Sequence, residues 1–218
     1  MFTELIDTLR CPNPHEDSWL VASSTRSEAR HIIEGTLGCP ICRASFAIVD
    51  GIARFAEPVA QDPIESLDDE AAFRLAAQLH LVEAPEPVLL IGAWTTAAIP
   101  LLRLTPTVKL FLGNSRLARV VPGQSSTITH STARFPLAAA SLRAIAIDVT
   151  HATDALLGDC TRVLRVSGRL VAPASVVLNT ALWKPLARDD EVLVAERLPT
   201  LSGLVQLKRA PAKPLFSS

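Results

Sequence analysis

The sequence predicts an α/β protein made of a small cysteine-containing N-terminal unit and a larger, doubly wound sheet that ends in an antiparallel hairpin. Three observations support this fold class. From residue 87 onward, short apolar runs alternate with helix-compatible segments. Two cysteine-proline turns lie within the first 42 residues. The chain has 218 residues, 49% hydrophobic and 20% charged, which suits a soluble protein with a substantial core.

Three segments are expected: a small domain over residues 1–57, an acidic linker and helix over 58–85, and the sheet domain over 86–218. Residues 86–218 carry 15 Lys and Arg against 8 Asp and Glu, although the whole chain has a net charge of -1. The acidic helix can pack on this basic part, or the basic part can bind an anionic partner such as RNA. The arginines are scattered, which favours the first interpretation.

The composition also bears on where the protein works. No apolar run approaches the roughly 20 residues that a bilayer requires, so we expect no membrane partner. The segment "MFTELIDTLRCP" contains acids and no long apolar core, so it does not read as a signal peptide. We therefore expect a cytoplasmic protein, whose cysteines are free thiols or metal ligands rather than disulfides.

Four side chains of the N-terminal unit have the pattern of a zinc site. "CPNPH" supplies Cys11 and His15, and "CPIC" supplies Cys39 and Cys42. Tetrahedral zinc takes four nitrogen or sulfur ligands, commonly as two close pairs brought together across a loop. His31 is an alternative fourth ligand, and a site that has lost its metal is a further alternative. Two reduced cysteines beside an unrelated pair would be the simplest structural explanation.

Residues 45–55, "SFAIVDGIARF", have the strand, Asp-Gly turn and strand of a hairpin. Together, "LIDTLRCP" and "GCPICRASFAIVDGIARF" resemble the short zinc-ribbon family related to the activator subunit of tRNA, rRNA and release-factor methyltransferases. The resemblance covers about the first 57 residues and implies a zinc ribbon that docks on protein. In one departure, the family's second cysteine falls near Pro14, which His15 follows here.

The acidic segment is predicted to form one amphipathic helix, "SLDDEAAFRLAAQLHLVE", over residues 66–83. Ser66 followed by Asp69 matches a capping box, and the acids of the first turn suit the helix dipole.

Beyond residue 86, apolar runs predict five strands within strand–helix units and a closing antiparallel pair, which makes seven strands in total. Pro100 should kink or shorten the first helix of this part. The strands are expected over 88–92, 108–113, 125–130, 142–150 and 167–174; the helices over 95–104, 115–121 and 154–166; and the hairpin over 190–197 and 203–210.

Two segments of this part resemble class I S-adenosylmethionine-dependent methyltransferases. "RVLRVSGRLVAPA" is similar to their Arg-Val-Leu-x-Pro-Gly-Gly-x-Leu segment, and "ARFPLAAASLRAIAID" to the stretch that leads into their fourth strand. The order and spacing of these segments imply a Rossmann-like, seven-stranded methyltransferase-type sheet over residues 86–209.

Set against that family, the cofactor-binding positions have changed. "VLLIGAWTTAAIP" keeps Gly92, but the next glycine positions hold Trp94 and Thr96, whose side chains would collide with a cofactor. Asn114 stands where an acid would hold the ribose, and His130 stands near the adenine position. Three changes together favour a fold that has lost its cofactor, with Trp94 in the emptied pocket. Taken alone, Trp94 is an ordinary core aromatic.

Asp148 lies at the C-terminal end of the fourth strand of this sheet, and His151 is three residues further on; they are the catalytic candidates if the protein is active. An Asp at that place more often caps the next segment. We therefore expect a degenerate, non-catalytic methyltransferase-like protein that serves as an interaction or scaffold subunit for a protein partner. The alternative is an active S-adenosylmethionine-dependent methyltransferase with an atypical cofactor loop.

Overall fold

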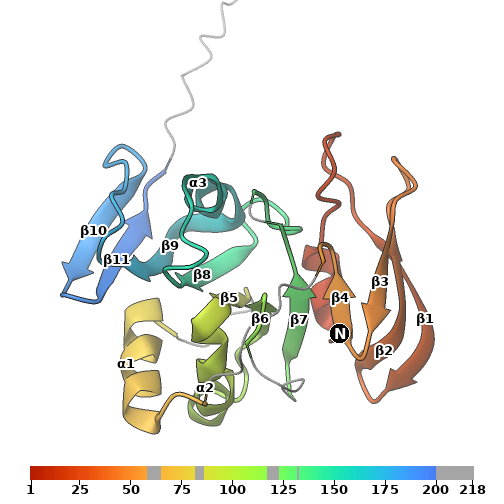
Figure 1. Cartoon of the computed structure of the whole chain (residues 1–218), viewed down its shortest axis with the longest axis horizontal. Helices are drawn as coiled ribbons and strands as arrows, with labels where there is room; N and C mark the ends of the chain where they lie inside the picture. Colours follow the sequence, from red (N-terminus) through yellow and green to blue (C-terminus); the bar gives the residue numbers. More distant parts are fainter. Residues whose placement is uncertain (58–64, 82–85, 117–122, 132, 200–218) are drawn as a thin grey trace, which may run out of the picture.

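In the computed structural model, which describes residues 1–57, 65–81, 86–116, 123–131 and 133–199, one mixed sheet runs through the whole molecule (Figure 1). Its strand order is β1-β2-β3-β4-β7-β6-β5-β8-β9-β11-β10. The strands are β1 (Val21–Glu28), β2 (His31–Gly38), β3 (Ser45–Val49), β4 (Ile52–Arg54), β5 (Val88–Ile91), β6 (Leu110–Gly113), β7 (Ser125–Thr129), β8 (Leu142–Ile147), β9 (Leu164–Pro173), β10 (Trp183–Arg188) and β11 (Val192–Arg197).

The centre of the sheet is doubly wound. Strands β7, β6, β5, β8 and β9 are parallel, so the first strand of this part lies between the second and the fourth. That order places the switch point of the winding between β5 and β8, where open α/β sheets bind ligands at the carboxyl ends of their strands. The predicted α/β class is confirmed to this extent: the sheet is mixed, and its central strands are parallel.

Helices cover both faces of this central part (Figure 1). Alternate side chains of β5 point to opposite faces: Leu90 packs with the helices α1 and α2, and Leu89 packs with α3. Burial on both faces explains why the parallel strands are continuous apolar runs. Within the described residues, no helix is both long and apolar enough to cross a membrane. The helical segments are η1 (Thr3–Thr8), α1 (Asp69–Leu79), η2 (Gly92–Ala97), α2 (Ala98–Leu104) and α3 (Asp154–Val163).

The N-terminal unit extends the same sheet. Strand β4 pairs in parallel with β7, and Ala53 faces Ile128 in that ladder. Both residues are fully buried in one apolar cluster that also contains Leu5, Leu9 and Leu37 of the N-terminal unit. The predicted count of seven strands was therefore wrong for the sheet, which has eleven strands within the described residues, because four strands of the N-terminal unit pair onto β7.

The closing hairpin lies earlier in the chain than predicted. Strand β11 matches the expected 190–197, but its hairpin partner is β10, and the expected strand over 203–210 lies outside the described residues. The sequence "WKPLAR" contains Pro185, which argues against a strand in the middle of a sheet. Here Pro185 lies in the edge strand β10, next to a register shift, so it removes no hydrogen bond that the interior of the sheet needs.

Two helix details also differ from expectation. Helix α1 begins at Asp69 with Asp68 as its cap, whose carboxylate accepts a hydrogen bond from the Ala71 N–H, rather than with Ser66. Pro100 lies in the first turn of α2, where its missing N–H leaves no helical hydrogen bond unmade. Most of the helix expected over 115–121 falls outside the described residues.

The shared core leads to a prediction about cooperativity. Leu37→Ala removes a fully buried side chain of the N-terminal unit and should cost about 3 kcal/mol. Because the core is continuous, the entire chain should unfold in one transition, roughly 6–12 °C lower than in the unmodified protein. Differential scanning calorimetry checks this, with the exposed Thr36→Ala as a control. A separate early transition, with the main transition unmoved, would contradict it.

Candidate functional site

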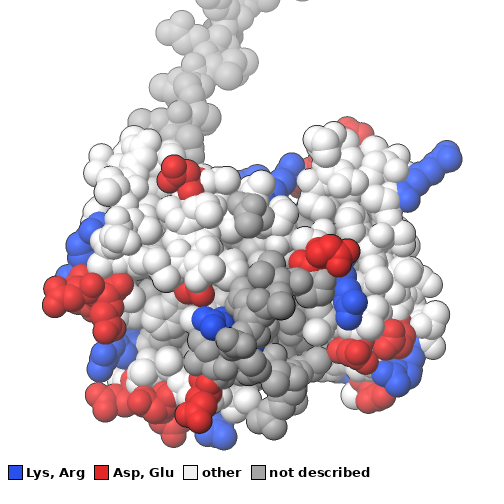
Figure 2. Space-filling model, in the orientation of Figure 1, with Lys and Arg blue, Asp and Glu red and all other residues white. Residues whose placement is uncertain are grey.

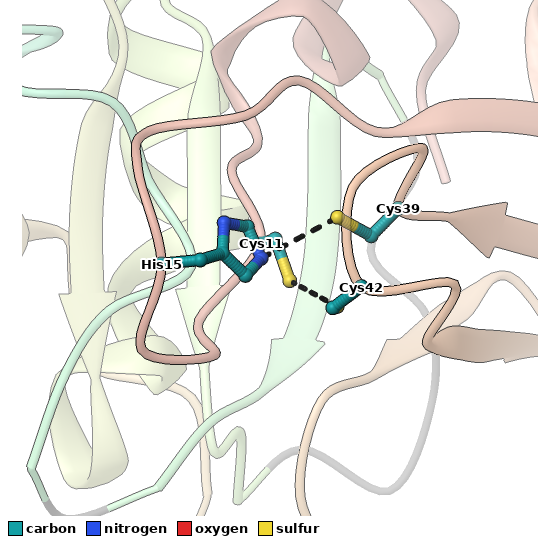
Figure 3. Close-up of side chains that lie close together, drawn as sticks. All are labelled: Cys11, His15, Cys39 and Cys42. Atoms are coloured by element: carbon teal, nitrogen blue, oxygen red, sulfur yellow. Dashed lines mark hydrogen bonds between the residues drawn. The ribbon is translucent and has the colours of Figure 1, made fainter.

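The structure brings the four expected metal ligands together. Cys11 and His15 lie on the loop after η1, and Cys39 and Cys42 lie on the turn between β2 and β3, so the two pairs face each other (Figure 3). All four ligand atoms lie within 4.8 Å of one another. The Sγ atoms of Cys11 and Cys42 are 3.7 Å apart, and Cys39 Sγ lies 3.5 Å from His15 Nε2.

These distances fit a tetrahedral zinc ion. Bond lengths of about 2.3 Å to sulfur and about 2.0–2.1 Å to nitrogen place tetrahedral neighbours about 3.8 Å apart for two sulfurs and about 3.5 Å apart for sulfur and nitrogen. His15 is also oriented for the role, because its Nδ1 donates to the Glu16 carbonyl at 2.6 Å and leaves Nε2 as the free ligand atom. The group of three cysteines and one histidine can therefore bind zinc.

The thiols differ in how readily they ionise. Hydrogen bonds from the Ala44 backbone and the Asn13 side chain lower the pKa of the exposed Cys42 to about 7. Burial raises the pKa of Cys11 to about 12. A bound cation favours the thiolate form of both. The alternative fourth ligand, His31, lies elsewhere, with its ring 5.2 Å from that of Phe2.

At the switch point, the loop after β5 is fastened to Asp148. Oδ2 of Asp148 accepts the Ala93 N–H at 2.8 Å, and Oδ1 accepts the backbone N–H and Nδ1–H of His151 at 3.0 and 2.7 Å. Burial alone would raise the pKa of Asp148, but the hydrogen bonds from His151 and Ala93 outweigh it and keep that pKa below its ordinary value.

This contact leaves no space at Gly92. Its φ of +62° is a conformation that favours glycine, and a Cβ there would lie 2.2 Å from Oδ2 of Asp148. The backbone of Gly92 is therefore packed against protein, at the position where a glycine-rich loop would approach a cofactor.

The ends of β6 and β7 are also joined to each other. Asn114 donates from Nδ2 to the His130 carbonyl at 3.2 Å and accepts the His130 N–H through Oδ1 at 3.0 Å. The imidazole of His130 is buried, and its Nε2 lies 2.9 Å from where a Cβ of Gly113 would be. Asn114 and His130, two of the predicted cofactor positions, thus bond to each other.

A cavity of about 650 Å³ lies beside Asp148. It opens at the carboxyl ends of β5, β8 and β9, and its size is that of a small-molecule pocket. None of the described residues that line it comes from β6 or β7. Its lining residues are Glu65, Ser66, Leu67, Asp68, Ala93, Trp94, Thr96, Ile147, Asp148, Val149, Pro173, Glu191 and Val192.

The sequence singled out only part of this cavity. Trp94 is one of its walls, whereas the atoms that pack on Gly92 belong to Asp148 and His151. Glu191 was not singled out, because it lies in the β10–β11 turn and β10 was not predicted. Its only sequence signal was the Asp-Asp-Glu run before an apolar strand, which is typical of any turn.

Several arginines of the C-terminal half are bound to α1. Arg143 donates to the His80 carbonyl at 3.1 and 3.0 Å, and Arg169 donates to the carbonyls of Ala77 and Gln78. Cations are favourable at the carboxyl end of a helix. These contacts agree with the packing interpretation of the charge asymmetry, and an RNA partner stays a prediction.

No protein-family model and no curated protein matches the chain. Among solved structures, it resembles a complex of the Haloferax volcanii Trm112 methyltransferase activator with a methyltransferase (17% identity, 48% of this chain and 54% of that one, TM-score 0.36). It also resembles geranyl diphosphate C-methyltransferase of Streptomyces coelicolor A3(2) (18%, 49% and 44%, 0.40) and a methyltransferase from an antibiotic biosynthesis pathway of Anabaena variabilis (16%, 50% and 46%, 0.41). The chain spans about half the length of these structures.

The buried imidazole of His130 leads to a prediction about pH. Burial lowers its pKa to about 4, so the folded protein binds fewer protons than the unfolded chain between about pH 4 and 6.5. Stability should therefore fall as the pH drops through this range, by on the order of 3 kcal/mol. Urea unfolding at several pH values between 4 and 7 gives the free energy of unfolding as a function of pH. This free energy should depend less steeply on pH in His130→Gln, whereas the exposed His80→Asn should keep the pH dependence of the unmodified protein. An equal pH dependence in all three proteins would contradict this assignment.

Proposed function

We propose that this chain is a methyltransferase-like protein that does not use S-adenosylmethionine and acts as a protein-interaction subunit with a structural zinc ribbon. The strand order and the two sequence segments resembling class I methyltransferases support the first part. The ribbon resemblance and the Cys11, His15, Cys39 and Cys42 group support the second.

The observation that carries the proposal is the Asn114–His130 pair. A ribose needs a hydrogen-bond acceptor at the end of β6, preferably a carboxylate. Asn114 is neutral there, and each polar atom of its amide already has a hydrogen bond to the backbone of His130. The contact of Gly92 on Asp148 supports the same proposal, because it lies where a cofactor loop would need space.

The metal is assigned a structural role. All four ligands of the candidate site come from the protein, so a bound zinc would have no open position for substrate. It would fasten the loop after η1 to the turn between β2 and β3.

The N-terminal unit also has the features of a docking surface. Strand β1 is an edge of the sheet, with almost all of its side chains exposed. Trp19 and Val21 are 71% and 65% exposed, and Ile41 in the second cysteine turn is 44% exposed. Open edges and exposed apolar side chains are what partner strands and partner surfaces bind.

A second candidate function is methyl transfer with an atypical cofactor loop. The cavity at the switch point favours it, because Asp148 lies in its wall. Against it, Asp148 already accepts three hydrogen bonds, which stabilise its ionised form and make it a weaker base. Cofactor binding separates the two candidates.

The first test is S-adenosylmethionine binding by calorimetry. We expect no binding at about 1 mM, where a binding free energy near -4 kcal/mol would already be visible. Asn114→Asp should not restore it, although Asp tolerates the same left-handed backbone. The carboxylate would lose the hydrogen bond to the His130 carbonyl, so this variant should be less stable by about 1–3 kcal/mol. Micromolar binding to the unmodified protein would place the second candidate first.

The second test concerns zinc. Elemental analysis of protein purified without chelator should find about one equivalent. His15→Asn should bind less zinc, while His31→Gln should keep the full amount, because His31 lies outside the ligand group. Less than about a tenth of an equivalent in the unmodified protein would rule out the site.

Cys42→Ser separates the effect of the metal from that of packing. Cys42 is exposed, so losing its sulfur costs little burial, and any large fall in melting temperature reflects the lost ligand. The nearby exposed Ser45→Ala is the control. Equal melting temperatures for Cys42→Ser and the unmodified protein would contradict a structural metal.

A further inference from the structure

The cavity at the switch point has a one-sided charge. Among the described residues that line it, four are acids, namely Glu65, Asp68, Asp148 and Glu191, and none is Lys or Arg. Figure 2 shows acidic side chains, with basic ones among them, on the side of the molecule that α1 and the β10–β11 hairpin form. A cavity with carboxylates of one sign attracts cations and repels anions.

Two of these carboxylates are available to a ligand. Asp148 is occupied by three donors, and Asp68 caps α1 through the Ala71 N–H. Glu65 and Glu191 are exposed, and neither forms an ion pair with another described residue. The two residues are far apart in the sequence: Glu65 precedes α1, and Glu191 follows β10.

Most of the rest of the wall is apolar, with Ser66 and Thr96 as its uncharged polar residues. Trp94 contributes its indole, and Leu67, Ile147, Val149 and Val192 contribute aliphatic side chains. An indole face attracts cations through its quadrupole, more strongly than any other aromatic side chain. An apolar wall with a few acceptors at the rim suits a ligand with an apolar body and a cationic end.

We propose that this cavity binds an amine-type organic cation, in which a protonated amine lies near Trp94, Glu65 and Glu191 and an apolar body contacts the aliphatic wall. This inference goes beyond the proposed function and does not depend on it, because the cavity has no wall from β6 or β7, the strands whose ends that function concerns. Two sources share this chemistry: a free small amine, and a lysine side chain that a protein partner presents.

The test uses three matched probes: 2-phenylethylamine, neutral 2-phenylethanol and anionic phenylacetate. Binding is followed by ¹⁵N NMR through the indole N–H of Trp94, assigned with Trp94→Leu, and through the backbone amide of Ala93. We expect the amine to bind at least about fivefold more tightly than the alcohol, which corresponds to one effective ion pair. Phenylacetate should bind more weakly still.

Two variants test the residues. Glu191→Gln should weaken amine binding by about two- to fivefold and leave alcohol binding unchanged. Asp190→Asn is its matched control, because it removes the same charge one residue away without lining the cavity. Trp94→Leu, read through Ala93, should weaken amine binding by roughly two- to fivefold.

A capped lysine peptide distinguishes a free amine from a lysine side chain of a protein partner. Equal binding by the amine and by a capped Gly-Lys-Gly peptide would support a partner's lysine; binding by the amine alone would support a small molecule. The proposal is overturned if no probe binds at about 10 mM, if phenylacetate binds as tightly as the amine, or if Asp190→Asn and Glu191→Gln weaken binding equally. The S-adenosylmethionine titration uses another ligand and reports on the proposed function separately.

Discussion

The candidate site depends on the hydrogen bonds that the carboxylate of Asp148 accepts. It ties the turn after β5 to the segment after β8 through Ala93 and His151, so the two strands on either side of the switch point end in one bonded unit. The positive φ of Gly92 and the burial of His151 both follow from this closeness. In an open α/β sheet this is where a ligand is expected, and here Asp148 packs on Gly92 while Asn114 is hydrogen-bonded to His130. The remaining space is displaced toward β9 and the β10–β11 turn.

The second organising constraint is the parallel pairing of β4 with β7. It makes the N-terminal unit an extension of the main sheet and places Leu5, Leu9 and Leu37 in the same core as Phe111 and Ile128. Zinc bound between the two turns of this unit would therefore stabilise more than a local loop. Because the core is shared, whatever holds Cys11 near Cys42 also supports the part of the sheet in which β4 pairs with β7.

Whether the sequence could predict a feature depended on how far apart in the chain its residues lie. Apolar runs and ligand spacing are local, so they predicted the parallel strands and the group of Cys11, His15, Cys39 and Cys42. The β4–β7 pairing joins segments that are far apart, and an exposed strand edge has no periodic signal that names its partner. Strand β10 was missed because Pro185 is tolerated only at an edge, which the sequence does not reveal. The Asn114–His130 bonds were also invisible, because they depend on how closely two parallel strands end.

If protein atoms have replaced the cofactor at the ends of β5 and β6, a crystal of the protein soaked with S-adenosylhomocysteine should show Asn114 bonded to His130, Asp148 bonded to Ala93, and no nucleoside density beside Gly92. Clear density for a ribose at Asn114, with the Asn114–His130 hydrogen bonds broken, would show instead that the cofactor site is intact.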